Sequence, residues 1–184
     1  MKQIVFIAFT IFSSISFGQE ELTRILFILD ASNSMNARWG SQTRIESAKE
    51  LLAKTVDNLR DTPNLEIALR VYGHQSPITA TFEDCNDTKL EIPFAKNNFT
   101  KVKMRIKSIY AKGSTPIARS LEAAASDFPD QNSRNVIILI TDGLEACDND
   151  PCVIAKKLKE KRNATIKKNL YKCILIKKTL IIFK

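Results

Sequence analysis

Five side chains with hard oxygen donors could together hold a metal ion. Asp30, Ser32 and Ser34 follow a buried strand at every second position, so a turn can bring one carboxylate and two hydroxyls to one centre. Thr115 adds a third hydroxyl from a loop that leads into a helix, and Asp142 adds a second carboxylate after another strand. Two carboxylates and three neutral hydroxyls suit Mg²⁺ or Mn²⁺, which keep water ligands and an open position, whereas Ca²⁺ usually collects more carboxylates.

Each acid taken alone also has an ordinary structural explanation. An aspartate after a strand often caps a helix or shapes a turn, and the two serines can serve the same turn. In open α/β sheets, however, ligands bind at the carboxyl ends of strands, near the point where strand order reverses. Because the three loops are expected to meet at that edge, their combination predicts a metal site.

The spacing of apolar residues predicts the elements that position these loops. Continuous apolar runs at 24–29 and 136–140 are typical of strands buried on both faces of a parallel sheet. At 65–71, every second residue is a large apolar one, which predicts a further strand. Residues 44–59 have helical spacing, with a capping box that begins at Thr43. The remaining expected elements are a short strand near an edge at 89–94 and helices at 99–109, 116–128 and 151–161.

The alternation of strands and helices predicts an α/β fold with a doubly wound, mostly parallel sheet and helices on both faces. The 184 residues, of which 44% are hydrophobic, suit one domain with a core of its own. We expect that domain to occupy residues 19–162, between a leader at 1–18 and an atypical tail at 163–184.

The N-terminus has the three parts of a secretory signal peptide. A positive start at Lys2 precedes an almost unbroken apolar run at 4–12, and Ser16 and Gly18 are small residues at the positions that a signal peptidase reads. A buried N-terminal element is the alternative. Cleavage near Gly18 predicts a protein that is secreted or periplasmic.

The net charge of +8 is concentrated at the C-terminus. Eleven lysines and arginines and one glutamate lie between Lys156 and Lys184, so the preceding residues together carry a net charge of about −2. The folded part therefore lacks a basic stripe, and no nucleic-acid partner is expected. A tail without a binding role is favoured, and contact of the basic tail with a membrane is the alternative.

Four cysteines in an exported chain are disulfide candidates. Cys147 and Cys152 are near neighbours, and we expect them to pair, although Cys85 competes for either of them. A disulfide that closes so small a loop contributes about 2 kcal/mol to the free energy of unfolding by the chain-entropy estimate. A zinc site is a weak alternative because the chain has one histidine, His74, and lacks a second closely spaced cysteine pair.

Several of these segments resemble the von Willebrand factor A (VWA) domain, in its bacterial secreted or periplasmic branch. The resemblance runs from about Thr23 to Arg162 and includes Asp-Ala-Ser-Asn-Ser at 30–34, Gly-Ser-Thr-Pro-Ile at 113–117 and Ile-Thr-Asp-Gly at 140–143. These segments are similar to the family's metal-ion-dependent adhesion site (MIDAS). The resemblance implies that Ser32, Ser34 and Thr115 contact the metal directly and that Asp30 and Asp142 act directly or through water. It also implies that an acidic residue of a protein partner completes the coordination.

The chain departs from the family pattern near Arg162. The family continues into a strand with a glycine-rich end, a further helix and another strand, whereas residues 163–184 are rich in lysine, isoleucine and leucine and lack glycine and proline. We expect a truncated or frameshifted C-terminus, with the last strands of the sheet missing or replaced. The apolar runs at 173–176 and 180–183 are candidates for replacement strands.

The resulting prediction is a metal-dependent module for adhesion or assembly, and not an enzyme. The chain has no Gly-x-Ser-x-Gly elbow and no phosphate-binding loop, and no orienting partner can be assigned to His74 from the sequence. A metal-dependent hydrolase and a non-functional fragment are the alternatives, and a hydrolase would need more ligands and a general base.

Overall fold

The computed structural model describes residues 21–130, 132–147, 149–160 and 179–182. Its elements in chain order are β1 (Thr23–Asp30), η1 (Asn33–Asn36), β2 (Arg38–Trp39), β3 (Gln42–Thr43), α1 (Arg44–Asn58), β4 (Leu65–Tyr72), β5 (Thr88–Ala95), α2 (Phe99–Ser108), α3 (Ile117–Asp127), β6 (Arg134–Ile140), α4 (Pro151–Glu160) and β7 (Thr179–Ile182). The expected signal peptide lies outside these residues.

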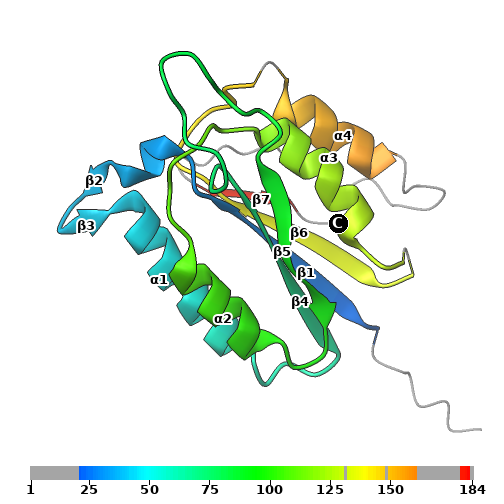
Figure 1. Ribbon diagram of the computed structural model, residues 1–184. Coiled ribbons are helices and arrows are strands. Elements are labelled where there is room, and N and C mark those ends of the chain that lie inside the picture. The colour runs from blue at the N-terminus through cyan, green and yellow to red at the C-terminus, as the bar shows by residue number, and fades with distance from the viewer. Residues whose placement is uncertain (1–20, 131, 148, 161–178, 183–184) are drawn as a thin grey trace, which may run out of the picture.

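The central sheet has the order β5-β4-β1-β6-β7 (Figure 1). β1 lies in the middle and pairs in parallel with β4 on one side and with β6 on the other, while β5 and β7 pair antiparallel at the two edges. The predicted α/β fold is confirmed. Strand order reverses beside β1. The carboxyl ends of β1, β4 and β6 therefore lie at the end of the sheet where ligands bind in such folds.

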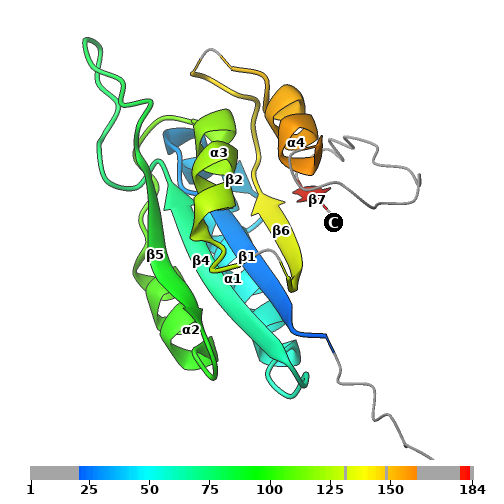
Figure 2. The same ribbon diagram turned by 90° about the vertical axis from the view of Figure 1, so that its right-hand side faces the viewer.

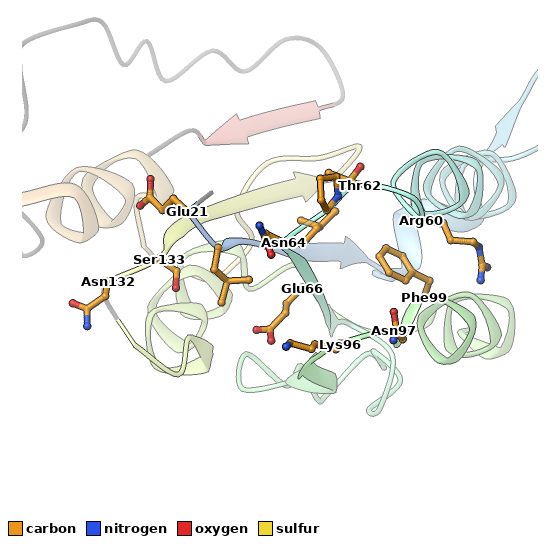
Figure 3. Close-up of a pocket in the computed structure, with 13 residues that line it drawn as sticks. Glu21, Arg60, Thr62, Asn64, Glu66, Lys96, Asn97, Phe99, Asn132 and Ser133 are labelled. Carbon is orange, nitrogen blue, oxygen red and sulfur yellow. The ribbon is translucent and has the colours of Figure 1, made fainter. Parts of the chain in front are cut away.

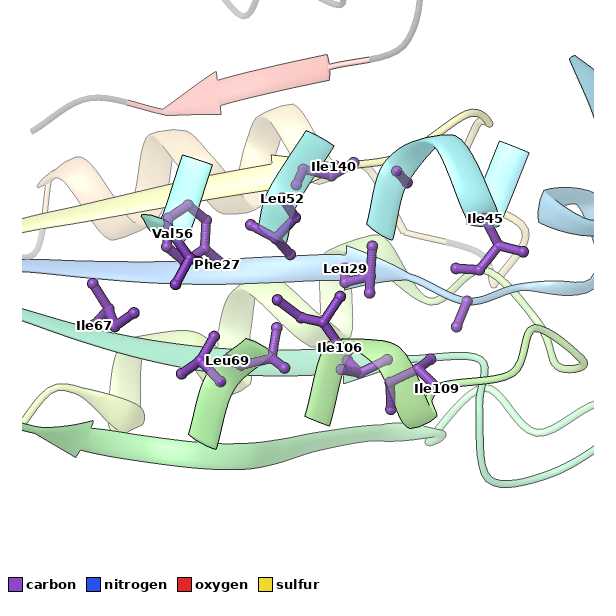
Figure 4. Packing of buried hydrophobic residues seen from close by; sticks show 14 of the residues in the cluster. Phe27, Leu29, Ile45, Leu52, Val56, Ile67, Leu69, Ile106, Ile109 and Ile140 are labelled. Carbon is purple, nitrogen blue, oxygen red and sulfur yellow. The ribbon is translucent and has the colours of Figure 1, made fainter. Parts of the chain in front are cut away.

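Alternate side chains of β1 face opposite helical layers. Phe27 and Leu29 are fully buried in a cluster with α1 and α2 (Figure 4), and Leu26 and Ile28 are fully buried in a second cluster with α3 and α4. Figure 1 shows α1 and α2 on one side of the sheet and α3 and α4 on the other, and Figure 2 turns the sheet toward the viewer with α3 in front of it. A strand that buries both faces in this way must be apolar throughout, which explains its unbroken run.

Most expected elements are confirmed to within a few residues. Thr43 caps α1 in a complete capping box with Glu46, as the sequence predicts. The short β2–β3 hairpin was not expected, because two-residue strands leave no periodicity in the sequence.

A short strand near the C-terminus, expected from the apolar run at 180–183, is present as β7 at one lateral edge of the sheet. β7 pairs antiparallel with β6, from Ile137 opposite Ile182 to Ile140 opposite Thr179. Residues 161–178, which include most of the atypical tail, lie outside the described part of the chain. Among the described helices, none has the length and apolar character that a membrane span requires.

Candidate metal centre

The parallel register brings the predicted metal-binding loops together at one edge of the sheet. Asp30 is the last residue of β1 and lies opposite Tyr72 at the end of β4. On the other side, Leu29 lies opposite Ile140, so Asp142 follows β6 directly beside the end of β1. The first ligand segment and Asp142 are thus neighbours because their strands are neighbours.

A chain of hydrogen bonds connects four of the five predicted ligands. The Asp30 Oδ1 atom accepts a bond of 2.8 Å from the Ser32 backbone N–H. The Ser32 and Ser34 hydroxyls lie 3.0 Å apart, and the Ser34 hydroxyl donates to Asp142 Oδ1 over 2.9 Å. The carboxylates and hydroxyls of both loops therefore converge on one small volume.

Thr115 is tied to the same edge through the backbone. Ser32 forms an isolated parallel bridge with Gly113, and the Asn33 N–H donates to the Gly113 carbonyl over 2.8 Å. The Thr115 carbonyl accepts a bond of 3.2 Å from the Ala146 N–H in the loop that carries Asp142. Among the described residues, the side-chain hydrogen bonds of the site do not include the Thr115 hydroxyl.

Gly73 allows the three loops to approach one another. Its φ is +68°, and a Cβ atom there would lie 2.5 Å from the Ser114 carbonyl oxygen and 2.8 Å from the Ser32 backbone. Only glycine combines this backbone conformation with so close an approach. The residue after β4 is therefore part of the site's framework, although it offers no ligand.

Asp30 is a buried carboxylate surrounded by neutral donors. Its side chain accepts from the Ser32 N–H and, over 2.7 Å, from the Thr141 hydroxyl. Burial raises the pKa of Asp30, although these hydrogen bonds oppose the shift. Burial also raises the pKa of the adjacent Tyr72 phenol well above its ordinary value, and the charge of Asp30 adds to that effect.

Arg44 pairs with Asp142 and was not predicted from the sequence. The Nη1 atom of Arg44, the first residue of α1, forms an ion pair with Asp142 Oδ2, and the Asp142 side chain is only 4% exposed. The two acids therefore differ: Asp142 has a cationic partner, whereas no ion pair within the described residues involves Asp30.

A disulfide links the loop after β4 to the loop after β6. It joins Cys85 to Cys147, so the expected pairing of Cys147 with Cys152 is wrong. The physical reason is that Cys152 lies in the first turn of α4, whereas the sheet places the other two loops at the same edge. Because the Cys85 and Cys147 sulfurs are bonded to each other, they do not offer the thiolates that a zinc site would need.

His74 has partners that the sequence did not identify. Its Nε2 atom lies 2.9 Å from Glu91 Oε1, and its Nδ1 atom lies 3.7 Å from Asp87 Oδ1. Arg105 also pairs with Glu91 over 2.6 Å. Burial alone would raise the pKa of Glu91, but hydrogen bonds from Arg105 and His74 outweigh it and lower the pKa to about 2.

A separate hollow of about 880 Å³ lies at the other end of the strands, where β1 and β4 begin (Figure 3). Its lining includes Asn64 and Leu65 at the start of β4, and Glu66, which pairs with the buried Arg24 over 2.8 Å. None of the five predicted metal ligands lines it. It is therefore distinct from the candidate metal centre.

Comparison with known sequences matches residues 25–145 to the family model of the von Willebrand factor type A domain. The uncharacterized protein YwmD of Bacillus subtilis is 29% identical over 160 residues, which cover 84% of this chain and 70% of YwmD.

Comparison with solved structures finds the same fold in larger proteins. Proximal thread matrix protein 1 of the mussel byssus, in a structure with a zinc-occupied MIDAS motif, superposes with a TM-score of 0.58 at 21% identity. The vWF domain of the type V pili tip protein Mfa5 of Porphyromonas gingivalis gives 0.51 at 20% identity. The matches cover 77% and 68% of this chain but only 34% and 39% of those chains.

Proposed function

Because the chain belongs to the von Willebrand factor type A domain family, we propose that it binds a protein partner through a divalent metal ion. Asp30, Ser32, Ser34, Thr115 and Asp142 hold the ion in this proposal, and an acidic side chain of the partner completes the coordination. Relatives of this fold include a matrix protein and a pilus tip protein, which is consistent with a protein-binding module.

The buried charge of Asp30 carries the proposal. Burying an ionised carboxylate is costly unless a cation or several hydrogen bonds compensate it. Asp30 has neutral donors around it, and the Ser32 hydroxyl lies beside the Ser34 hydroxyl, which donates to Asp142. A dication at this point supplies the missing positive charge and offers an open position to an external carboxylate.

The charges of the site favour an anionic partner. Asp30 and Asp142 contribute two negative charges, and the paired Arg44 contributes one positive charge. With a dication bound, the centre carries an excess of about one positive charge, which attracts a carboxylate and disfavours a cationic group.

The ligand chemistry favours Mg²⁺ or Mn²⁺. Hydroxyls and carboxylates are hard oxygen donors, and the number of carboxylates is low for Ca²⁺. The zinc in the mussel protein was found in that protein's MIDAS motif, so Zn²⁺ belongs in the same titration series.

We propose a binding role in preference to catalysis. His74 is the single histidine, and its Nε2 atom lies 2.9 Å from Glu91 Oε1. A hydrolase would need a general base within reach of the metal-bound group, and no predicted ligand has that role.

We further propose that the protein acts outside the cytoplasm. The Cys85–Cys147 disulfide supports this location, because disulfides persist in oxidising compartments. The expected signal peptide at 1–18 and the extracellular character of the pilus protein point the same way.

Water-proton relaxation with Mn²⁺ tests the proposal. Binding of Mn²⁺ to the protein should enhance relaxation, because the bound ion retains exchangeable water. The blocked peptide Ac-Gly-Glu-Gly-NH₂ should then reduce the enhancement by displacing water, and the neutral analogue with glutamine should not. A folded protein that gives no enhancement, or an equal effect of the two peptides, would overturn the proposal.

A further inference from the structure

A hollow of about 270 Å³ lies directly beside the candidate metal centre. It is lined by Thr141 and Gly143, the two neighbours of Asp142, and by Ile117, which follows Thr115 by two residues. The hollow therefore begins where two of the predicted metal-binding loops end. Figure 1 shows the elements around it, with α3 and α4 on the same face of the sheet.

The surface inside the hollow is mainly apolar. Ile117 and Leu139 belong to the core cluster on this side of the sheet and are 2% and 1% exposed. Leu144 stands on the lip and is 75% exposed, although it is a large apolar side chain. An exposed leucine next to an apolar cavity is the arrangement expected of a contact site.

The two carboxylates that line the hollow are already engaged with the backbone. Glu145 accepts a bond of 2.6 Å from the Ala118 N–H in the first turn of α3. Asp150 accepts a bond of 2.8 Å from the Cys152 N–H in the first turn of α4. These acids cap helices, and their negative charges also disfavour a second acidic group in the hollow.

We propose that this hollow is a specificity subsite that takes one large aliphatic or aromatic side chain of the protein partner. The inference rests on the proposed function, because the side chain belongs to the same partner whose acidic group reaches the metal. The subsite selects partners in which an apolar residue stands next to the acid. The metal supplies the attraction for the carboxylate, and the hollow distinguishes one acidic segment from another.

Two blocked peptides test the subsite by NMR titration of the ¹⁵N-labelled, Mg²⁺-saturated protein. Ac-Gly-Leu-Glu-Leu-Gly-NH₂ should bind about tenfold more tightly than Ac-Gly-Ser-Glu-Ser-Gly-NH₂, because one leucine side chain leaves water. Leu144→Ser should remove most of this preference. Leu51→Ser is the matched control, because Leu51 is 56% exposed on α1, and it should retain the preference.

The outcomes separate the subsite from the metal proposal. Equal affinity of the two peptides, or an unchanged preference in Leu144→Ser, overturns the subsite and leaves metal-dependent binding intact. If neither peptide binds to the metal-saturated protein, the proposed function fails and the subsite fails with it. Both substituted side chains are exposed, so the variants should fold, and their ¹⁵N spectra without peptide verify this.

Discussion

The Ser34 hydroxyl donates a hydrogen bond of 2.9 Å to Asp142 Oδ1, although the two residues are 108 positions apart in the sequence. This bond exists because β1 and β6 are parallel neighbours and end at the same edge of the sheet. The site therefore depends on tertiary structure: neither loop forms it alone, and any change that separates the loops should weaken metal binding.

Gly73→Ala should disrupt the site through the backbone. The added methyl group would lie 2.5 Å from the Ser114 carbonyl and 2.8 Å from the Ser32 backbone, in a conformation with φ of +68°. We expect a loss of about 3 kcal/mol in the free energy of unfolding, measured by urea denaturation, and weaker Mg²⁺ binding by the folded fraction.

Gly40→Ala provides the control for backbone strain. Gly40 has a similar φ of +64°, but its added methyl group would have no atom within 4 Å. The cost should be about 1 kcal/mol, with Mg²⁺ affinity unchanged. Equal effects of the two substitutions would show that close packing at Gly73 is unimportant.

Arg44→Gln should strengthen the binding of the divalent ion. The guanidinium pairs with Asp142 and competes for the same carboxylate, so its removal should raise Mg²⁺ affinity about fivefold, or about 1 kcal/mol. Calorimetric titration measures the change. Arg38→Gln removes an equal charge from the nearby hairpin and should have a much smaller effect. A weaker affinity in Arg44→Gln would instead mean that Arg44 holds Asp142 in position.

Replacing Cys85 and Cys147 together by serine should cost stability and metal affinity. The disulfide closes a segment of 62 residues, which corresponds to about 4 kcal/mol in the chain-entropy estimate. It also connects the loop of Asp142 to the loop after β4. Denaturation and Mg²⁺ titration of the double variant measure both effects. Unchanged Mg²⁺ affinity would show that the metal centre does not depend on this connection.

The stabilising contribution of the Glu91 carboxylate should be lost in acid. Its pKa in the folded state is about 2, below the ordinary value of 4.5. Its contribution is therefore fully present above pH 4.5 and is lost as the pH falls from about 4.5 to about 2. Glu91→Gln should remove a contribution of order 2 kcal/mol at neutral pH.

Urea denaturation between pH 2 and pH 7 measures this contribution, with Glu122→Gln as the control for an exposed glutamate. The difference between wild type and Glu91→Gln should shrink as the pH falls through this window. A difference that stays constant with pH would show that the loss reflects packing and not charge.

The sequence predicted that the candidate ligands at the ends of strands would lie close together. Asp30 and Asp142 each follow an unbroken apolar run, and parallel strands end at a common edge, so their approach could be inferred from the pattern. Ser32 and Ser34 followed from their spacing after Asp30. The helices could also be predicted from the sequence, because amphipathic spacing and the Thr43 cap are local signals.

The sequence could not predict contacts that depend on how loops cross in space. Arg44 begins a helix, and nothing local indicates that its guanidinium reaches Asp142. Cys85 and Cys147 are distant in sequence, whereas the nearer Cys152 was the more natural choice until the fold placed the loops. His74 likewise finds Glu91 across the β4–β5 pair.

Calorimetric titration of Mg²⁺ into wild type and Asp30→Asn measures whether Asp30 holds a divalent ion. We expect one site in the wild type, and an affinity at least about 100-fold lower in Asp30→Asn. The variant should have equal or greater thermal stability in EDTA, because it removes a buried charge. A folded wild type that takes up no Mg²⁺, Mn²⁺ or Zn²⁺, or an Asp30→Asn variant that binds as tightly as the wild type, would show that these residues do not form a metal centre.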